Sequence, residues 1–190
     1  GITPLVSRDP QDVQQADALV LPGQGACHSA MLALAQHGLT RAVREAIERG
    51  IPFLGICIGL QLLFDTSEEG EVNCLGIIPG RVRRLPPGLK IPHMGWNTVH
   101  LETNHPIFTG IPQDSHFYFV HSYYVEPFSD SSIAGTTSYG ISFCSAVTYK
   151  NLVATQFHPE KSSTWGLKIY ENFLAFAERP NNSKTGTTTE

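Results

Sequence analysis

Short apolar runs and amphipathic stretches alternate along the first third of the chain. Residues 18–21 are apolar over a length that suits a buried strand and not a helix, and residues 51–56 repeat this pattern. Between them, residues 31–35 have a helical composition, and residues 40–49 place apolar side chains on one helical face, with Thr40 as the predicted N-cap. Strand, helix and strand in this order predict parallel βαβ units and hence an α/β fold.

The second half of the chain has a different pattern, because strand-like runs follow one another with few helical segments between them. A polar, acidic loop at 65–74 marks the change. Turn residues separate the predicted strands, which lie at 76–85, 97–101, 116–125, 133–137, 143–149 and 152–157. These runs predict antiparallel hairpins. They are followed by a last helix at 164–177, which Ser162 or Ser163 caps. We also expect a short strand at 2–6 and a disordered polar tail at 179–190.

Composition limits the classes of function that the chain can serve. Its 190 residues suit one well-buried domain, which we place at residues 1–178. A net charge of −4 argues against nucleic acid or an anionic membrane as a partner, and no apolar run is long enough to span a bilayer. The 4 cysteines form no C-x-x-C pair, which indicates reduced thiols in the cytoplasm. The same cysteine spacing argues against zinc, and the glycine-rich motifs that bind nucleotide phosphates are missing, so we expect no metal and no cofactor.

Cys57 stands where the predicted strand 51–56 turns into an apolar helical pattern. Gly55 lies two residues before it, and Gly59 lies two residues after it. A nucleophile on a sharp strand-to-helix turn with small neighbours is the arrangement of a nucleophile elbow. The helix N-terminus behind the sulfur favours the thiolate form. The alternative is a buried structural cysteine, since free cysteine is among the most buried residue types.

A nucleophilic cysteine requires a base, and the best candidate among the 8 histidines is His158. It follows the predicted strand 152–157, at the kind of strand end where α/β proteins build their sites. Glu160 is close enough in sequence to hold one imidazole nitrogen and thereby fix the tautomer. A turn histidine that only ends the strand is the alternative.

Three further stretches each have a structural and a functional interpretation. The turn at 22–25 is either a plain turn or a set of backbone N–H groups for an oxyanion. His121 lies in a strand rich in Phe and Tyr, which is most often sheet packing. Trp96, beside a glycine, either packs in a turn or serves as an interface anchor.

Taken together, these motifs resemble the class I glutamine amidotransferases. That family combines a P-G-x-G turn, a G-x-C-x-G-x-Q elbow and a late H-P-E, which stand here in the family order at 22–25, 55–61 and 158–160. Further stretches are similar to the glutaminase subunits of imidazole glycerol phosphate synthase, from histidine biosynthesis, and they lie at 68–70, 75–82, 92–97, 118–123 and 156–162. The Pro-His-Met-Gly-Trp-Asn stretch at 92–97 is the most diagnostic. The likeness extends to about residue 176.

The resemblance implies a flavodoxin-like three-layer fold, with a mostly parallel central sheet and antiparallel strands in its second half. Cys57 would attack the side-chain amide of L-glutamine, while His158, oriented by Glu160, moves protons through a γ-glutamyl thioester. The residues implied to bind substrate are Gly23, Gly25, Ile58, Gln61, Glu69, His121, Ser122 and Tyr123. Ammonia would pass to a cyclase subunit with a (β/α)₈ barrel, in a heterodimer that makes imidazole glycerol phosphate and aminoimidazole carboxamide ribotide. The residues implied to face that partner are Trp96, Asn97, Tyr118 and Lys161.

Two features depart from the family pattern. The family normally has one further βα unit ahead of the position of Gly1, so we expect this first unit to be missing from the sheet. Gln24 replaces a small apolar residue in the oxyanion turn and is expected to alter its resting conformation or the basal rate. One alternative function is an amidotransferase subunit for another acceptor, and a second is a truncated, non-catalytic homologue that keeps the partner-binding face. The intact Cys57, His158 and Glu160 favour an enzyme.

Overall fold

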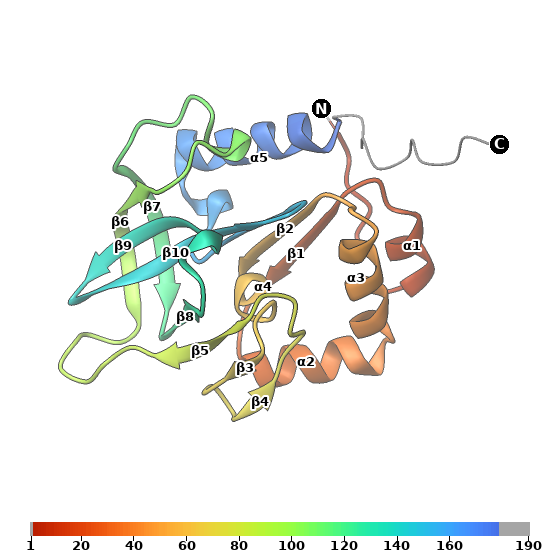
Figure 1. The fold of residues 1–190 in the computed structure, drawn as a ribbon, viewed down its shortest axis with the longest axis horizontal. Coiled ribbons are helices and arrows are strands. Elements are labelled where there is room, and N and C mark those ends of the chain that lie inside the picture. Colours follow the sequence, from red (N-terminus) through yellow and green to blue (C-terminus); the bar gives the residue numbers. More distant parts are fainter. Residues whose placement is uncertain (1, 179–190) are drawn as a thin grey trace.

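The computed structural model of the chain describes residues 2–178 (Figure 1). The first half contains α1 (Pro10–Gln15), β1 (Leu19–Gly23), α2 (Cys27–Gln36), α3 (Leu39–Glu48), β2 (Phe53–Cys57) and α4 (Ile58–Gln61). The second half contains β3 (Thr66–Ser67), β4 (Val72–Asn73), β5 (Gly80–Arg84), β6 (His93–Leu101), β7 (Ser115–His121), β8 (Tyr123–Pro127), β9 (Ile133–Tyr139), β10 (Ile141–Tyr149), β11 (Leu152–Thr155) and α5 (Ser163–Ala177). The predicted tail 179–190 lies outside the described residues.

A mixed sheet joins the two halves of the chain. Its main path runs β1-β2-β11-β10-β8-β5-β3-β4, and β6, β7 and β9 extend it from β10. The pairs β1–β2 and β2–β11 are parallel, whereas β10 pairs antiparallel with β8, β9 and β11. The α/β class and the antiparallel second half are therefore as predicted, although the parallel part is smaller than expected. Helices α1 to α3 gather beside β1 and β2, whereas α5 packs against β7 and runs along the top of the view (Figure 1).

Several predicted boundaries need correction. Residues 2–6 form no strand, and Val6 is 93% exposed, because no neighbouring element offers this segment a backbone partner or apolar cover. Helix α3 begins at Leu39 with the left-handed Gly38 as its N-cap, so Thr40 lies inside the first turn and is not the cap. The predicted loop 65–74 contains the short strands β3 and β4. Ser162 occupies the N-cap position of α5, but its hydroxyl makes no capping hydrogen bond, because it is bonded to the His158 carbonyl and the Tyr118 N–H.

Helix α1 was not anticipated from the hydrophobic pattern, because none of its residues is buried. It is instead started by local polar chemistry. The Asp9 carboxylate accepts a hydrogen bond from the Gln11 N–H at 2.8 Å, and Pro10 supplies a preset φ at the first helical position. The capping residues thus start helix α1 in a segment where the pattern of apolar residues does not predict a helix.

The core lies where the parallel strands meet the flanking helices. Every residue of β2 is buried, and Val43 and Ile47 of α3 belong to the same buried apolar cluster. In the second half, Phe117 stacks on Phe157 with ring centroids 4.2 Å apart. Fully burying one such side chain contributes roughly 1.5–3 kcal/mol, so these contacts fix the strand ends that form the site. None of the helices within residues 2–178 is long and apolar enough to cross a membrane.

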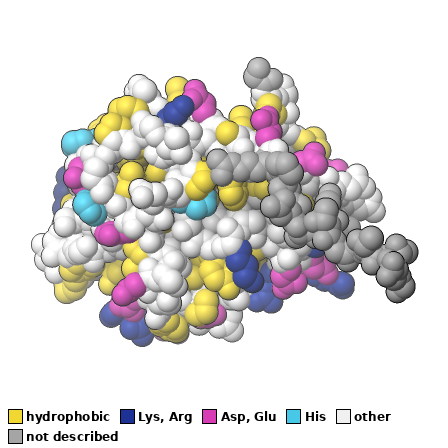
Figure 2. Space-filling view, turned by 45° about the horizontal axis from the view of Figure 1, so that its top comes forward, with side chains coloured by type: hydrophobic (Ala, Val, Ile, Leu, Met, Phe, Trp, Pro, Cys, Tyr) yellow, Lys and Arg dark blue, Asp and Glu magenta, His cyan; other side chains and the backbone are white. Residues whose placement is uncertain are grey.

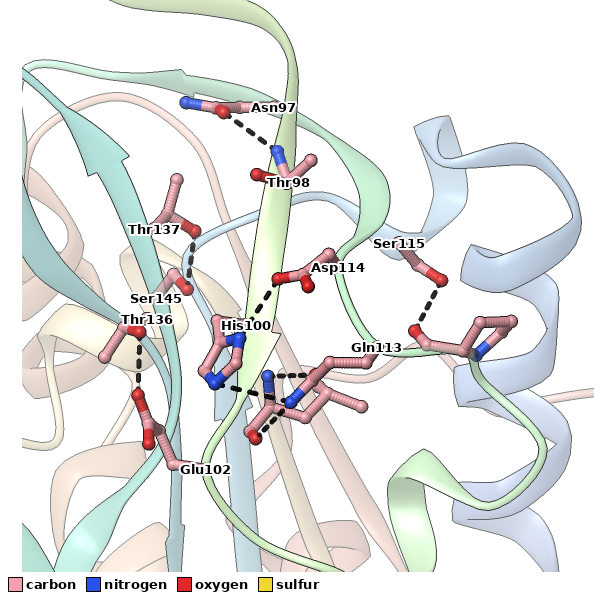
Figure 3. Close-up of polar contacts among 12 residues, drawn as sticks. Asn97, Thr98, His100, Glu102, Gln113, Asp114, Ser115, Thr136, Thr137 and Ser145 are labelled. Atoms are coloured by element: carbon pink, nitrogen blue, oxygen red, sulfur yellow. Dashed lines mark hydrogen bonds and ion pairs between the residues drawn. The ribbon is translucent and has the colours of Figure 1, made fainter.

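Polar ties hold β6 against its neighbours (Figure 3). The Thr136 hydroxyl on β9 donates at 2.9 Å to Glu102, which directly follows β6. On the same strand β9, the buried Thr137 hydroxyl donates to the Ser145 hydroxyl of β10 at 2.9 Å, which holds β9 in place beside β6. The Gln113 side chain accepts from the Leu101 N–H and donates to the Leu101 carbonyl. These contacts fix the strand that carries the 92–97 motif.

On the face in Figure 2, acidic and basic side chains lie close together, without one broad basic surface.

Candidate active site

Cys57 occupies a sharp turn from strand to helix. It ends β2 with φ 55° and ψ −106°, a strained conformation for a residue with a side chain, and α4 begins at the next residue. A Cβ atom on Gly59 would lie 2.0 Å from the Leu21 carbonyl oxygen, and one on Gly55 would lie 2.8 Å from the Gly59 oxygen. The two glycines are therefore required by the close approach of backbone around the thiol. The elbow geometry predicted from the sequence is present.

A cavity of about 370 Å³ opens above this turn. Its walls are formed by Gly23, Gln24, Gly25, Cys57, Ile58, Gln61, Glu69, Pro92, Val120, His121, Ser122, Tyr123, His158 and Lys161. All eight residues that were predicted to bind substrate lie in this wall, together with Cys57 and His158. Pro92 and Val120 were not singled out from the sequence. Within residues 2–178, no group of three or more His, Cys, Asp or Glu side chains is arranged to hold a metal ion.

His158 is buried and has one ring nitrogen in use. Its Nδ1 atom lies 2.7 Å from Glu160 Oε1, and an ionised carboxylate can only accept, so Nδ1 carries the proton. The Nε2 atom is buried without a hydrogen-bond partner among the described residues. The free lone pair is thus on Nε2, the atom able to take a proton from a group in the cavity.

The backbone of β7 holds the His158 turn in place. The His158 N–H donates to the Tyr118 carbonyl at 2.9 Å. The Ser162 hydroxyl donates to the His158 carbonyl at 2.6 Å and accepts from the Tyr118 N–H at 2.9 Å. The imidazole is therefore positioned by β7 and by the N-cap residue of α5, not by Glu160 alone.

The side chain of Cys57 is in the protonated thiol form at neutral pH, because its pKa is raised. Burial raises its pKa to about 11, and the negative charge of Glu160 adds to the rise. The Ile58 N–H and the Gln156 amide, whose Nε2 lies 3.7 Å from the sulfur, act in the opposite direction. The sequence-based expectation that the helix N-terminus favours a thiolate is not met. Helix α4 is only 4 residues long, and burial of the thiol outweighs the hydrogen-bond donors near the sulfur.

We expect the alkylation of Cys57 by iodoacetamide to reflect this raised pKa. The thiolate is the reactive form, so the rate should climb about tenfold per pH unit up to about pH 11, whereas an unfolded thiol levels off near its ordinary pKa of about 8.5. Peptide mass spectrometry would follow each cysteine separately. Cys74 is the internal reference, because a hydrogen bond with Cys27 lowers its pKa. A Cys57 rate that levels off below pH 9 would contradict the expectation.

Gln61 and Glu69 line the cavity but are also held firmly by protein groups. The Gln61 Nε2 atom donates to the Tyr123 carbonyl and to Gln156 Oε1, each at 3.1 Å, and its Oε1 accepts from the Cys27 thiol. Glu69 Oε2 accepts from the Cys27 N–H at the start of α2. Gln156, which joins Gln61 to the sulfur of Cys57, was missed as a site residue. Its place in sequence, two residues before His158, was the available signal.

The residues predicted to face a partner lie outside the cavity, apart from Lys161 at its rim. Trp96 is 53% exposed and makes an edge contact with Tyr118, its neighbour in the β6–β7 pairing, with ring centroids 6.2 Å apart. Met94 is exposed on the same strand, and we call Met94, Trp96 and Tyr118 the Trp96 patch. Exposed apolar side chains next to one another are typical of protein interfaces. Asn97 is only partly buried.

Comparisons with known proteins agree with this geometry. The family model described as Glutamine amidotransferase class-I matches residues 4–176. The chain is 50% identical over 173 residues to the imidazole glycerol phosphate synthase subunit HisH of Dehalococcoides mccartyi strain CBDB1, covering 90% of this chain and 84% of the relative. It is 49% identical over 179 residues to the HisH subunit of Moorella thermoacetica, covering 94% and 85%. A solved structure of a glutamine amidotransferase matches with a TM-score of 0.70 at 20% identity, covering 91% of this chain and 85% of that one.

Proposed function

The chain belongs to the glutamine amidotransferase class-I family, and we propose that it is the glutaminase subunit of an imidazole glycerol phosphate synthase. The proposal is supported by the relatives named imidazole glycerol phosphate synthase subunit HisH, whose sequences are 50% and 49% identical to this chain. The residues that the family model matches, 4–176, lie inside the predicted domain 1–178. One observation supports the catalytic part of the proposal. The same cavity is lined by the elbow thiol of Cys57 and by His158, whose Nε2 atom has no hydrogen-bond partner among residues 2–178.

In the proposed reaction, Cys57 and His158 act on the side-chain amide of L-glutamine. The thiol gives its proton to His158 Nε2 as the sulfur attacks the amide carbon. The Ile58 N–H and the turn at 22–25 would hold the oxyanion, where each donor contributes on the order of 3 kcal/mol. The imidazolium then protonates the leaving nitrogen, and ammonia departs from a γ-glutamyl thioester. His158 next removes a proton from water, which cleaves the thioester to glutamate and frees the thiol.

Glu160 has a supporting role in this proposal. Its carboxylate accepts from His158 Nδ1–H at 2.7 Å, which keeps the tautomer with Nε2 free and stabilises the imidazolium that forms during the reaction. Glu160 does not line the cavity, so it works through the imidazole and not on the substrate. Gln61, Glu69 and the 121–123 segment are the proposed walls for the glutamine head group.

The ammonia product is proposed to pass to a cyclase subunit with a (β/α)₈ barrel, in the cytoplasm. The Trp96 patch and Lys161 are the proposed contact surface. Two links connect this surface to the site: Lys161 stands at the cavity rim, and the Tyr118 backbone holds the His158 turn. A partner that binds the Trp96 patch would therefore sit directly beside the cavity.

Ammonia release from L-glutamine tests the proposal. We expect a weak rate for the chain alone and a faster one when a cyclase subunit is added. Trp96→Ala should reduce the increase and the co-elution of the two proteins, because it removes the largest exposed side chain of the patch. Phe128→Ala is the matched control, since Phe128 is 67% exposed on a different segment. If the chain releases no ammonia from L-glutamine, with or without the cyclase, the proposed glutaminase activity is refuted. Co-elution with another synthase subunit instead would indicate a different acceptor.

A further inference from the structure

A continuous series of side-chain contacts runs from the partly buried Asn97, beside the Trp96 patch, to the buried imidazoles of His93 and His121. The Asn97 Nδ2 atom lies 3.2 Å from His93 Nε2. The His93 Nδ1 atom lies 2.9 Å from His121 Nε2, and the His121 Nδ1 atom lies 2.9 Å from the Tyr123 carbonyl oxygen. The pairing of β6 with β7 places His93 directly opposite His121. We call Asn97, His93, His121 and the groups they lead to the His93 network.

The last acceptor in this series fixes every proton in it. A carbonyl oxygen can only accept, so His121 carries its proton on Nδ1 and offers a lone pair on Nε2. His93 must then donate from Nδ1, which leaves its own Nε2 as an acceptor. The Asn97 amide supplies the donor for that atom. Both histidines are thereby neutral and held in the Nδ1–H tautomer, with all the hydrogen bonds pointing in one direction.

Contacts on Asn97 itself lead to the same assignment independently. Its Oδ1 atom accepts from the Thr98 N–H at 2.8 Å, as Figure 3 shows. Its Nδ2 atom donates to the Ser138 carbonyl at 2.9 Å. Both contacts require the amide orientation that turns the NH₂ group toward His93. The direction deduced from Tyr123 at one end therefore agrees with the orientation of Asn97 at the other.

The surroundings keep both imidazoles neutral and in place. The pKa of His121 is lowered to about 3, mainly by burial and to a smaller extent by His93 and His158, while its hydrogen bond with the Tyr123 carbonyl acts in the opposite direction. Burial also lowers the pKa of His93. The His93 ring is stacked between Tyr139, at a centroid distance of 4.0 Å, and Phe119, at 4.9 Å. A protonated His121 would turn an N–H toward the N–H of His93, so the arrangement depends on neutrality.

From Tyr123 the contacts continue to the nucleophile. The Tyr123 carbonyl accepts a second hydrogen bond from Gln61 Nε2, which also donates to Gln156 Oε1. The Gln156 Nε2 atom lies 3.7 Å from Cys57 Sγ, with the sulfur as acceptor. Gln61 and Gln156 are both fully buried, so neither amide has water as a substitute partner. The far end of the His93 network is thus the reacting atom.

We propose that His93 is a positioning residue of the glutaminase, which holds the cavity wall at Tyr123 and the Gln61–Gln156–Cys57 contacts in register through His121. This inference rests on the proposed function. His93 does not itself line the cavity, whereas its partner His121 does, so the effect of His93 on the reaction passes through His121. Because the network starts beside the Trp96 patch, a partner bound there can act on the cysteine through the orientation of the Asn97 amide.

The tautomers provide a test that does not depend on activity. Two-bond ¹H–¹⁵N correlation spectra of the full chain at neutral pH should show His93 and His121 both as neutral imidazoles protonated on Nδ1. His93→Phe would serve to assign the His93 signals. An Nε2–H tautomer or an imidazolium at either residue would overturn the network. If His93→Phe does not fold, the ring signals of the wild type can be assigned through correlations with the backbone, so the measurement remains decisive. It also remains decisive if the wild-type chain releases no ammonia, a result that would refute the proposed function separately.

Two substitutions separate the hydrogen bond of His93 from its ring packing. His93→Phe keeps the stacking but removes the donor, leaving His121 Nε2 buried without a partner. We expect kcat/KM for L-glutamine to fall on the order of tenfold or more, mainly in kcat, since the network ends at the sulfur. His93→Asn loses the ring but places an N–H near the former Nδ1 atom, and it should regain most of the rate. Tyr139→Phe, which keeps the stacked ring, is the control expected to match the wild type. An active His93→Phe with an inactive His93→Asn would show a packing role and overturn the proposal.

Discussion

Ammonia release from L-glutamine is expected to disappear when Cys57 is replaced by alanine, with the rate falling by at least about 10⁴-fold. The proposed route passes through a thioester on this sulfur, and the cavity wall contains no second thiol that could replace it. Cys27 is near but buried, and its S–H group is engaged with Gln61 Oε1. The measurement is ammonia or glutamate formation with and without the cyclase subunit, because stimulation by the partner makes a small residual rate easier to detect.

Cys144→Ala is the matched control for this substitution. Cys144 is also buried and also has a raised pKa, but its thiol donates to the Ala146 carbonyl, outside the cavity. Its loss removes a similar side chain without touching the proposed chemistry, so glutaminase activity should persist. A glutamine-mimicking electrophile should add to the wild type at Cys57 and leave Cys57→Ala unmodified. Full ammonia release by Cys57→Ala would refute the assignment of Cys57 as the nucleophile.

The elbow and the His158–Glu160 pair could be predicted because their chemistry is local. Gly55 and Gly59 stand on either side of Cys57 in the sequence, and the close approach that requires them involves the turn itself and the neighbouring strand. Glu160 lies two residues from His158, within reach of one ring nitrogen on a short turn. In both cases the sequence spacing determines the geometry, so reading the spacing was sufficient.

The His93 network could not be predicted, because it depends on pairing between distant strands. His93 and His121 meet only because the β6–β7 register aligns them, and a shift of one residue would turn one of them to the other face of the sheet. The role of Gln156 likewise depends on the arrival of α4 and β11 at the same point. The protonated thiol of Cys57 is a third case, since the sequence shows the helix start but not the depth of burial that outweighs it.

Thr40 and the segment 2–6 show how local preferences were overridden. Thr40 is a good capping residue, but the left-handed Gly38 already turns the chain into α3 two residues earlier. Residues 2–6 are apolar enough for a strand, yet a strand requires a neighbour to accept its backbone hydrogen bonds. The structure gives this segment neither a partner strand nor burial. Local propensity therefore indicates which conformation these residues favour, but the contacts with neighbouring elements decide which conformation they adopt.

Gly59→Ala is expected to destabilise the fold by at least about 3 kcal/mol, at the upper end of the range for overpacking. The new methyl group would lie 2.0 Å from the Leu21 carbonyl oxygen, which is backbone of β1 and cannot rotate away. Intrinsic helix preference favours alanine over glycine by about 1 kcal/mol, so it offsets only part of this clash. For a chain of this length the melting temperature should fall by roughly 6–12 °C.

Gly88→Ala separates this steric effect from the general cost of replacing a glycine. Gly88 has φ +92° in an exposed loop, and a Cβ atom there would meet no other atom within 4 Å. Its substitution costs only the left-handed backbone penalty of roughly 1–2 kcal/mol. The excess loss in Gly59→Ala, measured by thermal or urea unfolding of both variants, reports how rigidly β1 is held against the elbow. Equal losses would mean that β1 can move away from α4. Because β1 ends at Gly23 in the cavity wall, such movement would also mean that the elbow does not hold the proposed oxyanion turn at a fixed distance from Cys57.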